Sequence, residues 1–242
     1  MSIYQELLDA MVPGLFADEV TIGPFITAVR AGDRCGLATT LRPPGHDHRP
    51  ALKSPGGLSG RSLAELARLV HSNLPLEAGL GMAAINTGLD WTGLRLLERN
   101  GADYIRELAE DRNLVAVGHF SFIHELAPLT LSTVILELDP RSGDLPSTAA
   151  ARVIPEADVV AITGSAFSNH TIENLLELAR GKIIMVLGPT SPLSPLLFNR
   201  GVQVIAGSKV ADVGLTIRQV REGAVFKQLD GVSRVLMTRP SP

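Results

Sequence analysis

The second half of the chain repeats one pattern, in which an unbroken apolar run is followed by an amphipathic segment. The runs "NLVAVGHF", "DVVAITG" and "KIIMVLG" each reach a glycine, and small polar residues follow. Strands that are apolar on both faces are typical of parallel sheets covered by helices on both sides. This half is therefore predicted to be an α/β unit with a parallel sheet and helices on both faces.

In the first half, apolar and polar positions alternate instead. Residues 20–28 place apolar side chains at every second position, and residues 35–41 do so again after the turn "AGDR". This alternation is typical of strands with one buried face. We expect a β-hairpin here, with a bulge at Gly23-Pro24.

Two helices are predicted after the hairpin. Ser62 begins "SLAELARLVHS", and Glu65 three residues later completes a capping box. The segment "LEAGLGMAAINTGLD" is rich in alanine and glycine, so a neighbouring element should pack very close to it. The change of pattern places a domain boundary near Asn100-Gly101. Residues 1–100 then form a small α+β domain, and residues 101–242 an α/β domain.

Composition narrows the class of protein. The 242 residues are 45% hydrophobic but only 4% aromatic, and the net charge is −3. No block of Lys and Arg stands out, so nucleic acid is not an expected partner. No run approaches the ~20 apolar residues that span a membrane, and "MSIYQELLDAMVPG" is not a signal peptide. The lone Cys35 excludes a disulfide within the chain. We expect a cytoplasmic protein, and a homo-oligomer is left open.

Small polar residues gather where the apolar runs end. Ligands of open α/β sheets bind at the carboxyl ends of the strands. Ser168 or Asn169 is predicted to cap one helix, and Ser191 another, and such helix ends favour anions. The alternative is that these residues are caps and nothing more. The candidate ligand-binding residues at the strand ends are Thr163, Gly164, Ser165, Asn169, Pro189, Thr190 and Ser191.

Familiar catalytic motifs are absent from the sequence. No Gly-x-Gly-x-x-Gly follows a strand, and "GSK" lacks the upstream glycine of a phosphate-binding loop. "TGSAF" is not Gly-x-Ser-x-Gly, which makes Ser165 a weak nucleophile candidate. Whether the protein is an enzyme is therefore left open.

Several segments together resemble a known family. "TGSAFSNHTIENLLELAR", "VLGPTSPLSPLLFNRGVQVIAGSKVAD", "VGHFSFI" and "GMAAINT" are similar, in order, to the putative heavy-metal chelation family. The resemblance implies an enolase N-terminal-like domain followed by a Rossmann-like domain, with the site in the cleft between them. It does not imply enolase activity, because the barrel that supplies enolase chemistry does not fit in this length.

Two places could bind a metal. His119 follows a predicted strand, whose sheet neighbours would fix its position. His46-Asp47-His48 lies in a Pro/Gly-rich loop, which is either a solvated connector or a lid over the cleft. We favour His119. Histidine, asparagine and carboxylate ligands suit zinc, nickel, iron or cobalt, so the identity of a divalent transition metal stays open.

Two further residues complete the candidate site. Asn86 must be hydrogen-bonded if buried, and the resemblance places it at the cleft. Asp212 could cap a helix or bind a cation. The sequence thus predicts a protein that binds a small molecule or a heavy-metal ion or complex in a cleft. The alternatives are an enzyme acting on a phosphorylated or carboxylated metabolite, with His119 as acid/base, and a metal carrier.

Overall fold

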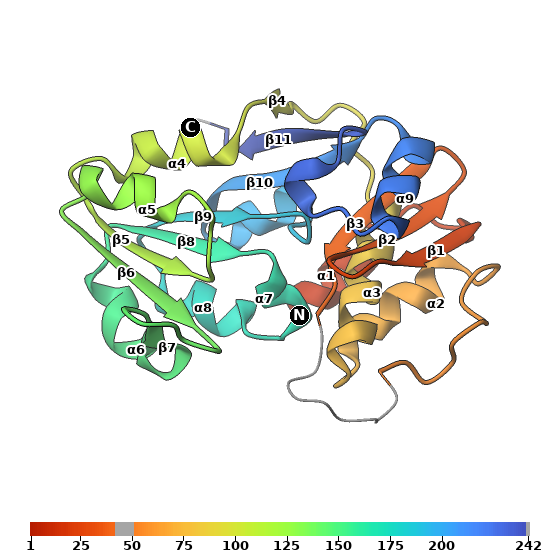
Figure 1. Ribbon diagram of the computed structural model, residues 1–242, viewed down its shortest axis with the longest axis horizontal. Coiled ribbons are helices and arrows are strands. Elements are labelled where there is room, and N and C mark those ends of the chain that lie inside the picture. The colour runs from red at the N-terminus through yellow and green to blue at the C-terminus, as the bar shows by residue number, and fades with distance from the viewer. Residues whose placement is uncertain (42–50, 241–242) are drawn as a thin grey trace.

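The computed structural model describes residues 1–41 and 51–240, so His46, Asp47 and His48 lie outside the described residues. The described chain folds into two sheets with helices around them (Figure 1). A three-stranded antiparallel sheet, in the order β1-β2-β3, precedes an eight-stranded sheet in the order β4-β11-β10-β9-β8-β5-β6-β7. This is the expected mixed α/β class.

The core of the large sheet is parallel, as the unbroken apolar runs predict. It consists of β5 (Asn113–Val117), β6 (Ser132–Glu137), β8 (Val159–Thr163), β9 (Ile183–Leu187) and β10 (Val202–Val210). β11 (Val232–Thr238) returns antiparallel along β10, and β4 (Leu97–Glu98) pairs antiparallel with β11. β7 (Leu145–Pro146) pairs with the end of β6. The antiparallel strands are additions to the predicted sheet.

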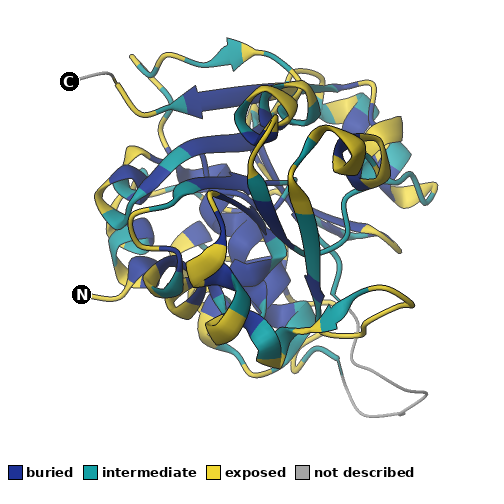
Figure 2. Ribbon diagram, turned by 90° about the vertical axis from the view of Figure 1, so that its left-hand side faces the viewer, coloured by how far each residue is buried: buried dark blue, intermediate teal, exposed yellow. Residues whose placement is uncertain are grey.

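Helices lie on both faces of this sheet (Figure 1), and its central strands β8, β9 and β10 are mostly buried, as part of the dark blue in Figure 2. Leu114 and Ala116 of β5 pack with α4 (Gly101–Ala109) and α5 (Ile123–Leu126). Val115 lies in the other core, with α7 (Ser165–Ser168) and α8 (Ile172–Leu178). α6 (Ala150–Val153) borders that core as well. Alternate residues of one strand thus face opposite helix layers.

The small sheet differs from its prediction. The segments β1 (Glu19–Ile22), β2 (Ile26–Ala31) and β3 (Arg34–Thr39) form three strands, with Gly23-Pro24 in the turn between two of them and not in a bulge. The expectation of a single buried face is wrong. One face packs on α3 (Pro75–Gly88), and the other packs on α9 (Val213–Arg221), which comes from the far end of the chain.

The remaining helical turns link these elements. Helices α1 (Ile3–Asp9) and α2 (Leu63–Ala67) lie with α3 in the core that the small sheet shares with the large one. The predicted capping box of Ser62 and Glu65 is present. The 3-10 turns are η1 (Arg68–His71), η2 (Ala127–Leu129), η3 (Ser147–Ala149), η4 (Ile154–Glu156), η5 (Pro195–Arg200) and η6 (Phe226–Gln228).

The chain reverses its direction across the large sheet at β5. From β5 it moves outward to β6 and β7, and then returns to β8, β9 and β10 on the opposite side. The carboxyl ends of β5 and β8 therefore border a topological switch point, where ligands of open α/β sheets bind. Gly118 and Thr163 meet there, and a Cβ on Gly118 would lie 2.9 Å from the Thr163 side chain.

Candidate functional site

A pocket of about 550 Å³ lies at the carboxyl ends of the parallel strands. We call it the carboxyl-edge pocket. Of the residues predicted from the sequence, His119, Thr163, Ser165 and Pro189 line it. Thr39, at the end of β3, contributes from the small sheet. Both sheets thus contribute to one pocket beside the switch point.

His119 is held in this pocket by two carboxylates. Its backbone N–H donates to Glu137 Oε1 at 2.7 Å, and its ring Nε2 lies 2.8 Å from Asp144 Oδ2. A carboxylate only accepts, so Nε2 carries the hydrogen of this bond. Nδ1 then has no partner among the residues that the structure describes. The side chain is 20% exposed, which leaves the ring accessible from the pocket.

Asp144 is fixed by the turn that contains it. The backbone N–H of Arg141 donates to Asp144 Oδ2 at 2.8 Å, and the Asp144 side chain is only 3% exposed. The hydrogen bond from Arg141, followed by that from His119, holds the pKa of Asp144 below its ordinary value. Asp144 is therefore a carboxylate at neutral pH. Sequence reasoning missed it, because "PRSGD" reads only as a turn.

Asn86 and Thr190 lie behind the pocket and tie its walls together. Asn86 is 7% exposed, and its Nδ2 donates to Leu37 O at 2.9 Å and to Thr190 O at 3.3 Å. Thr190 Oγ1 accepts a hydrogen bond from Thr39 N at 2.9 Å. These bonds join α3, β3 and the loop after β9. Asn86 does not line the carboxyl-edge pocket.

Gly164 and Ser191 form a close contact between neighbouring strand ends. Gly164 N donates to Leu187 O at 2.8 Å, and a Cβ on Gly164 would lie 2.6 Å from Ser191 N. Only glycine allows this approach. Ser191 is buried, and its Oγ has no partner in the described chain.

The predicted helix caps at these turns are wrong. Asn169 Oδ1 does accept from Thr171 N, but α8 begins one residue later, at Ile172, after the separate four-residue turn α7. Ser191 caps nothing, and η5 begins at Pro195. Because no long helix starts at residue 169 or 191, the reason for expecting an anion at these turns is lost.

Asn169 and Asp212 lie elsewhere. Asn169 lines a second pocket, of about 250 Å³, between the ends of β5, β6 and β8 and α8; Thr163 borders both pockets. Asp212 is exposed, and its Oδ1 accepts from Leu215 N at 2.9 Å. Asp212 thus caps α9, one of the two roles predicted for it.

The described residues offer a metal one oriented donor and not a complete set. Within residues 1–41 and 51–240, no group of three His, Cys, Asp or Glu side chains could hold an ion. Cys35 is 4% exposed, and burial raises the pKa of its thiol to about 12. His119 fits as a single ligand, because metal-binding imidazoles commonly donate their other N–H to a carboxylate.

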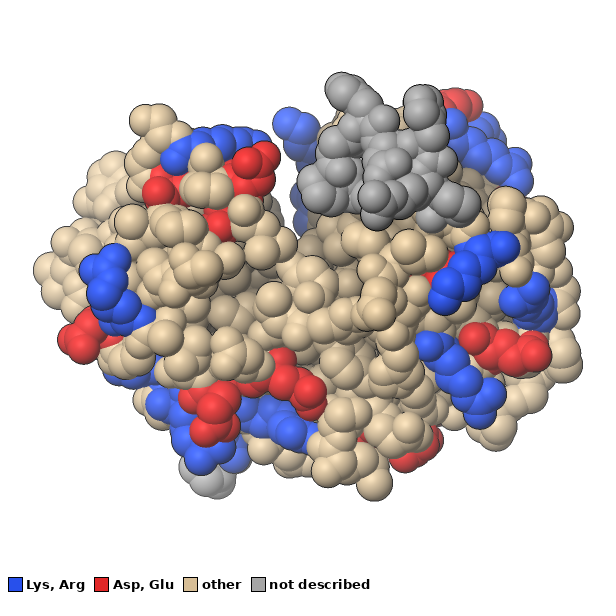
Figure 3. All heavy atoms as spheres, turned by 90° about the horizontal axis from the view of Figure 1, so that it is seen from below, with Lys and Arg blue, Asp and Glu red and all other residues tan. Residues whose placement is uncertain are grey.

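The mouth of the carboxyl-edge pocket carries more positive than negative side chains. Arg99, Arg106, Lys227 and Arg234 line it, against Asp103 and Glu125. Glu125 pairs with Arg106 at 3.7 Å. In the view from below, the surface has a hollow, and both Lys and Arg atoms and Asp and Glu atoms border it (Figure 3).

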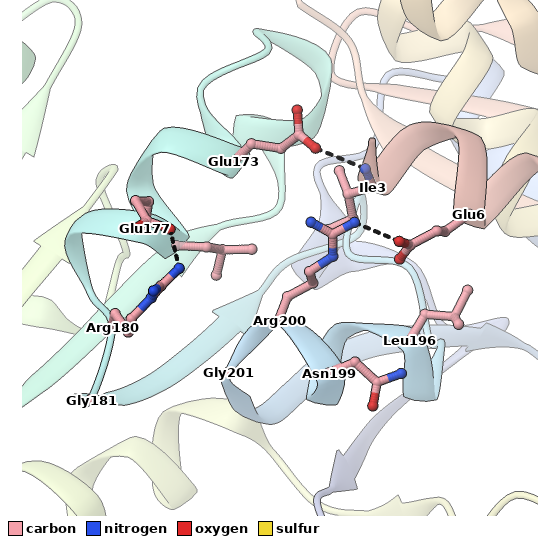
Figure 4. A pocket seen from close by; sticks show the side chains of 11 residues that line it. Ile3, Glu6, Glu173, Glu177, Arg180, Gly181, Leu196, Asn199, Arg200 and Gly201 are labelled. Carbon is pink, nitrogen blue, oxygen red and sulfur yellow. Dashed lines mark hydrogen bonds and ion pairs between the residues drawn. The ribbon is translucent and has the colours of Figure 1, made fainter. Parts of the chain in front are cut away.

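A further pocket, of about 670 Å³ at the amino ends of β9 and β10, has ion pairs in its lining. Arg200 reaches Glu6 at 2.5 Å, Arg180 reaches Glu177 at 2.6 Å, and Glu173 accepts from Ile3 N at 2.8 Å (Figure 4). None of the predicted site residues lines it. Two of its three carboxylates pair with its two arginines, and the third, Glu173, accepts a backbone N–H; the Glu6 and Glu173 contacts join α1 to η5 and α8.

Comparison with known proteins places the chain beside several relatives. A protein with unknown function from the DUF364 family of Desulfitobacterium hafniense matches with a TM-score of 0.86 and 28% identity, over 98% of both chains. A DUF364 protein from Pyrococcus horikoshii, 18% identical, shares the fold with a TM-score of 0.79 over 98% of both chains. An uncharacterized protein of Methanocaldococcus jannaschii is 27% identical over 82% of this chain and 79% of its own.

None of the helices in the described residues is long and apolar enough to cross a bilayer.

Two family models, DUF4213 and DUF364, match residues 4–89 and 100–238, and both are described as "putative heavy-metal chelation". Since the second model alone covers more than half of the chain, the protein belongs to this family.

Proposed function

We propose that this protein binds a small molecule that carries a heavy-metal ion, and that the carboxyl-edge pocket is where it does so. Residues 1–100 and 101–242 act as two domains in this proposal, with the pocket as the cleft between them. The observation that carries it is the geometry of His119, which lines the pocket: its Nε2 is hydrogen-bonded to Asp144, while no residue within 1–41 and 51–240 bonds its Nδ1.

A bound metal complex fits the pocket better than a bare ion. His119 supplies one donor, and no group of three His, Cys, Asp or Glu side chains among the described residues could complete a metal site. A small chelating molecule would supply the other ligands. A volume of about 550 Å³ suits such a molecule. When bound, the metal would act as the shared centre between chelator and protein.

The protein's own contribution is to orient the imidazole. Asp144 keeps the hydrogen on Nε2, which leaves the Nδ1 lone pair available as a donor. Glu137 holds the backbone of the same residue. Thr39 and the strand ends shape the wall around it.

Metal titration tests this proposal. Untagged wild-type protein is titrated at pH 7 with Zn²⁺ and Ni²⁺, alone and as their citrate complexes. The wild type should bind the complexes stoichiometrically. His119→Ala should weaken binding by at least the ~10- to 100-fold that loss of an outer-shell partner costs. His124→Ala, which removes an exposed histidine of α5, is the matched control and should bind normally.

Three results would count against the proposal. Equal binding by His119→Ala would remove His119 from the site. Greater loss in the His46→Ala/His48→Ala variant would place the site in the loop. Tight binding of bare ions, with no gain from the chelator, would favour a metal carrier.

The enzyme alternative has its own support. A histidine hydrogen-bonded to a carboxylate is also how many enzymes orient a general base, here with Nδ1 as the proton acceptor. The substrate would be a phosphorylated or carboxylated metabolite. A variant His119→Ala that loses turnover but keeps substrate binding would support this alternative.

A further inference from the structure

Lys227 and Arg234 stand apart from the other cations of the carboxyl-edge pocket. Arg99 pairs with Glu107 and lies over the Tyr104 ring. Arg106 pairs with Glu125. Neither Lys227 nor Arg234 has a carboxylate partner in the part of the chain that the structure describes. Among the described residues, Lys227 and Arg234 are thus the cations of the pocket lining without an ion-pair partner, and Asp103 is the carboxylate of the lining without one.

The Arg234 side chain is held in place without losing its charge. Its Nη2 donates to the backbone oxygen of Lys227 at 3.2 Å, and its Cζ lies 5.8 Å from the centre of the Phe226 ring. These contacts connect β11 to η6 at the pocket. A guanidinium that is already ordered loses less entropy when a ligand binds.

We propose that Lys227 and Arg234 bind an oxyanion, so that the ligand of this pocket carries a carboxylate or phosphate group. This inference rests on the proposed function, because it concerns the same pocket, and it specifies the chemistry of the ligand. The planar fork of Arg234 matches two oxygens of either group, and Lys227 adds a compact charge.

If Lys227 and Arg234 bind an oxyanion, one ligand could contact them and His119 at the same time. His119 lies at the end of β5, while Lys227 and Arg234 come from η6 and β11, and all three line the same cavity. A polycarboxylate or a phosphorylated chelator has charged groups for the cationic side and a further donor group for a metal at His119. A neutral chelator would leave the two cations unmatched.

Metal-free calorimetry tests the inference. Wild-type protein is first freed of metal with a chelating resin. Citrate and pyrophosphate are then titrated separately, so that binding of a carboxylate is distinguished from binding of a phosphate. At least one should bind, and its affinity should fall as salt is raised. Lys227→Ala and Arg234→Ala should each weaken it by about tenfold or more, the effect of losing a hydrogen bond between charged groups. Lys227→Arg should retain most of the affinity.

Lys182→Ala is the matched control, since it removes one positive charge at the amino end of β9, outside the pocket. It should bind the anion like the wild type, and all variants should melt normally. Loss of affinity in Lys182→Ala equal to that in Lys227→Ala, or wild-type protein that binds neither anion, would overturn the inference.

The two proposals fail separately. If zinc citrate binding depends on His119 but is indifferent to Lys227 and Arg234, the anion inference falls and the proposed function stands. If metal-free anions bind through Lys227 and Arg234 while the metal adds nothing, the anion inference stands and the metal proposal falls.

Discussion

Replacing Gly36 by alanine should destabilise the protein strongly, because this glycine is where β3 meets α3. A Cβ at residue 36 would lie 2.3 Å from Thr87 N, 2.4 Å from Ala83 O and 2.6 Å from Asn86 C, all backbone atoms of α3. Thr87 Oγ1 also accepts from Gly36 N at 3.0 Å and lies 2.8 Å from Val29 O. The added methyl group therefore cannot be accommodated by turning a side chain.

The magnitude follows from this geometry. Overpacking a core costs about 1–3 kcal/mol, and contacts with helix backbone belong at the upper end. A loss of about 3 kcal/mol should lower the melting temperature by about 6–12 °C in a chain of this size. The free energy of unfolding in urea should fall by the same amount, with the slope against urea unchanged.

Gly57→Ala is the matched control, since its Cβ would meet nothing closer than Arg61 Nη2 at 3.8 Å. It should stay within about 0.5 kcal/mol of the wild type. A Gly36→Ala protein that melts within about 1 °C of wild type would refute the close packing of β3 on α3.

Three other predictions concern single groups. Cys35, with its thiol pKa raised to about 12 by burial and then by Glu19, should resist thiol reagents in the native protein and react only after unfolding; rapid native labelling would contradict this. The pKa of Asp144 is lowered in the folded state, so its contribution to stability is present at neutral pH and is lost on acidification below about 4. The difference in unfolding free energy between wild type and Asp144→Asn should therefore close at low pH. A difference that stays constant with pH would contradict this prediction. Asp212→Ala should cost about 1 kcal/mol by removing the α9 cap, without affecting ligand binding, and a loss of binding would return Asp212 to the site.

The sequence predicts the parallel core well because its signal is local. A strand that is apolar on both faces can be recognised from its own residues, and β5, β8 and β9 are such strands. The second covered face of the small sheet could not be predicted in this way, because it depends on α9, which follows nearly two hundred residues later. For the same reason, the antiparallel pairing of β11 with β10 is not visible in either segment.

The candidate site also divides into residues that a local sequence signal identifies and residues that only long-range contacts bring together. The rule for strand ends identifies His119, Thr163, Ser165 and Pro189, which the structure brings into one pocket. This rule does not distinguish an open turn from a packed one: Ser191 is predicted to cap a helix, whereas the structure buries it and its Oγ bonds to no described residue. Sequence reasoning does not identify Asp144, which lies in a turn, or Arg234, which lies in β11; only the folded chain brings Asp144 to His119 and Arg234 to the pocket.

The most direct test of the central claim is the position of the metal. Crystals of untagged protein grown with zinc citrate are measured at the zinc absorption edge. The account predicts an anomalous peak about 2.0–2.1 Å from His119 Nδ1, the usual distance for zinc on histidine, with citrate density towards Lys227 and Arg234. A peak elsewhere, with the carboxyl-edge pocket free of zinc, would contradict it.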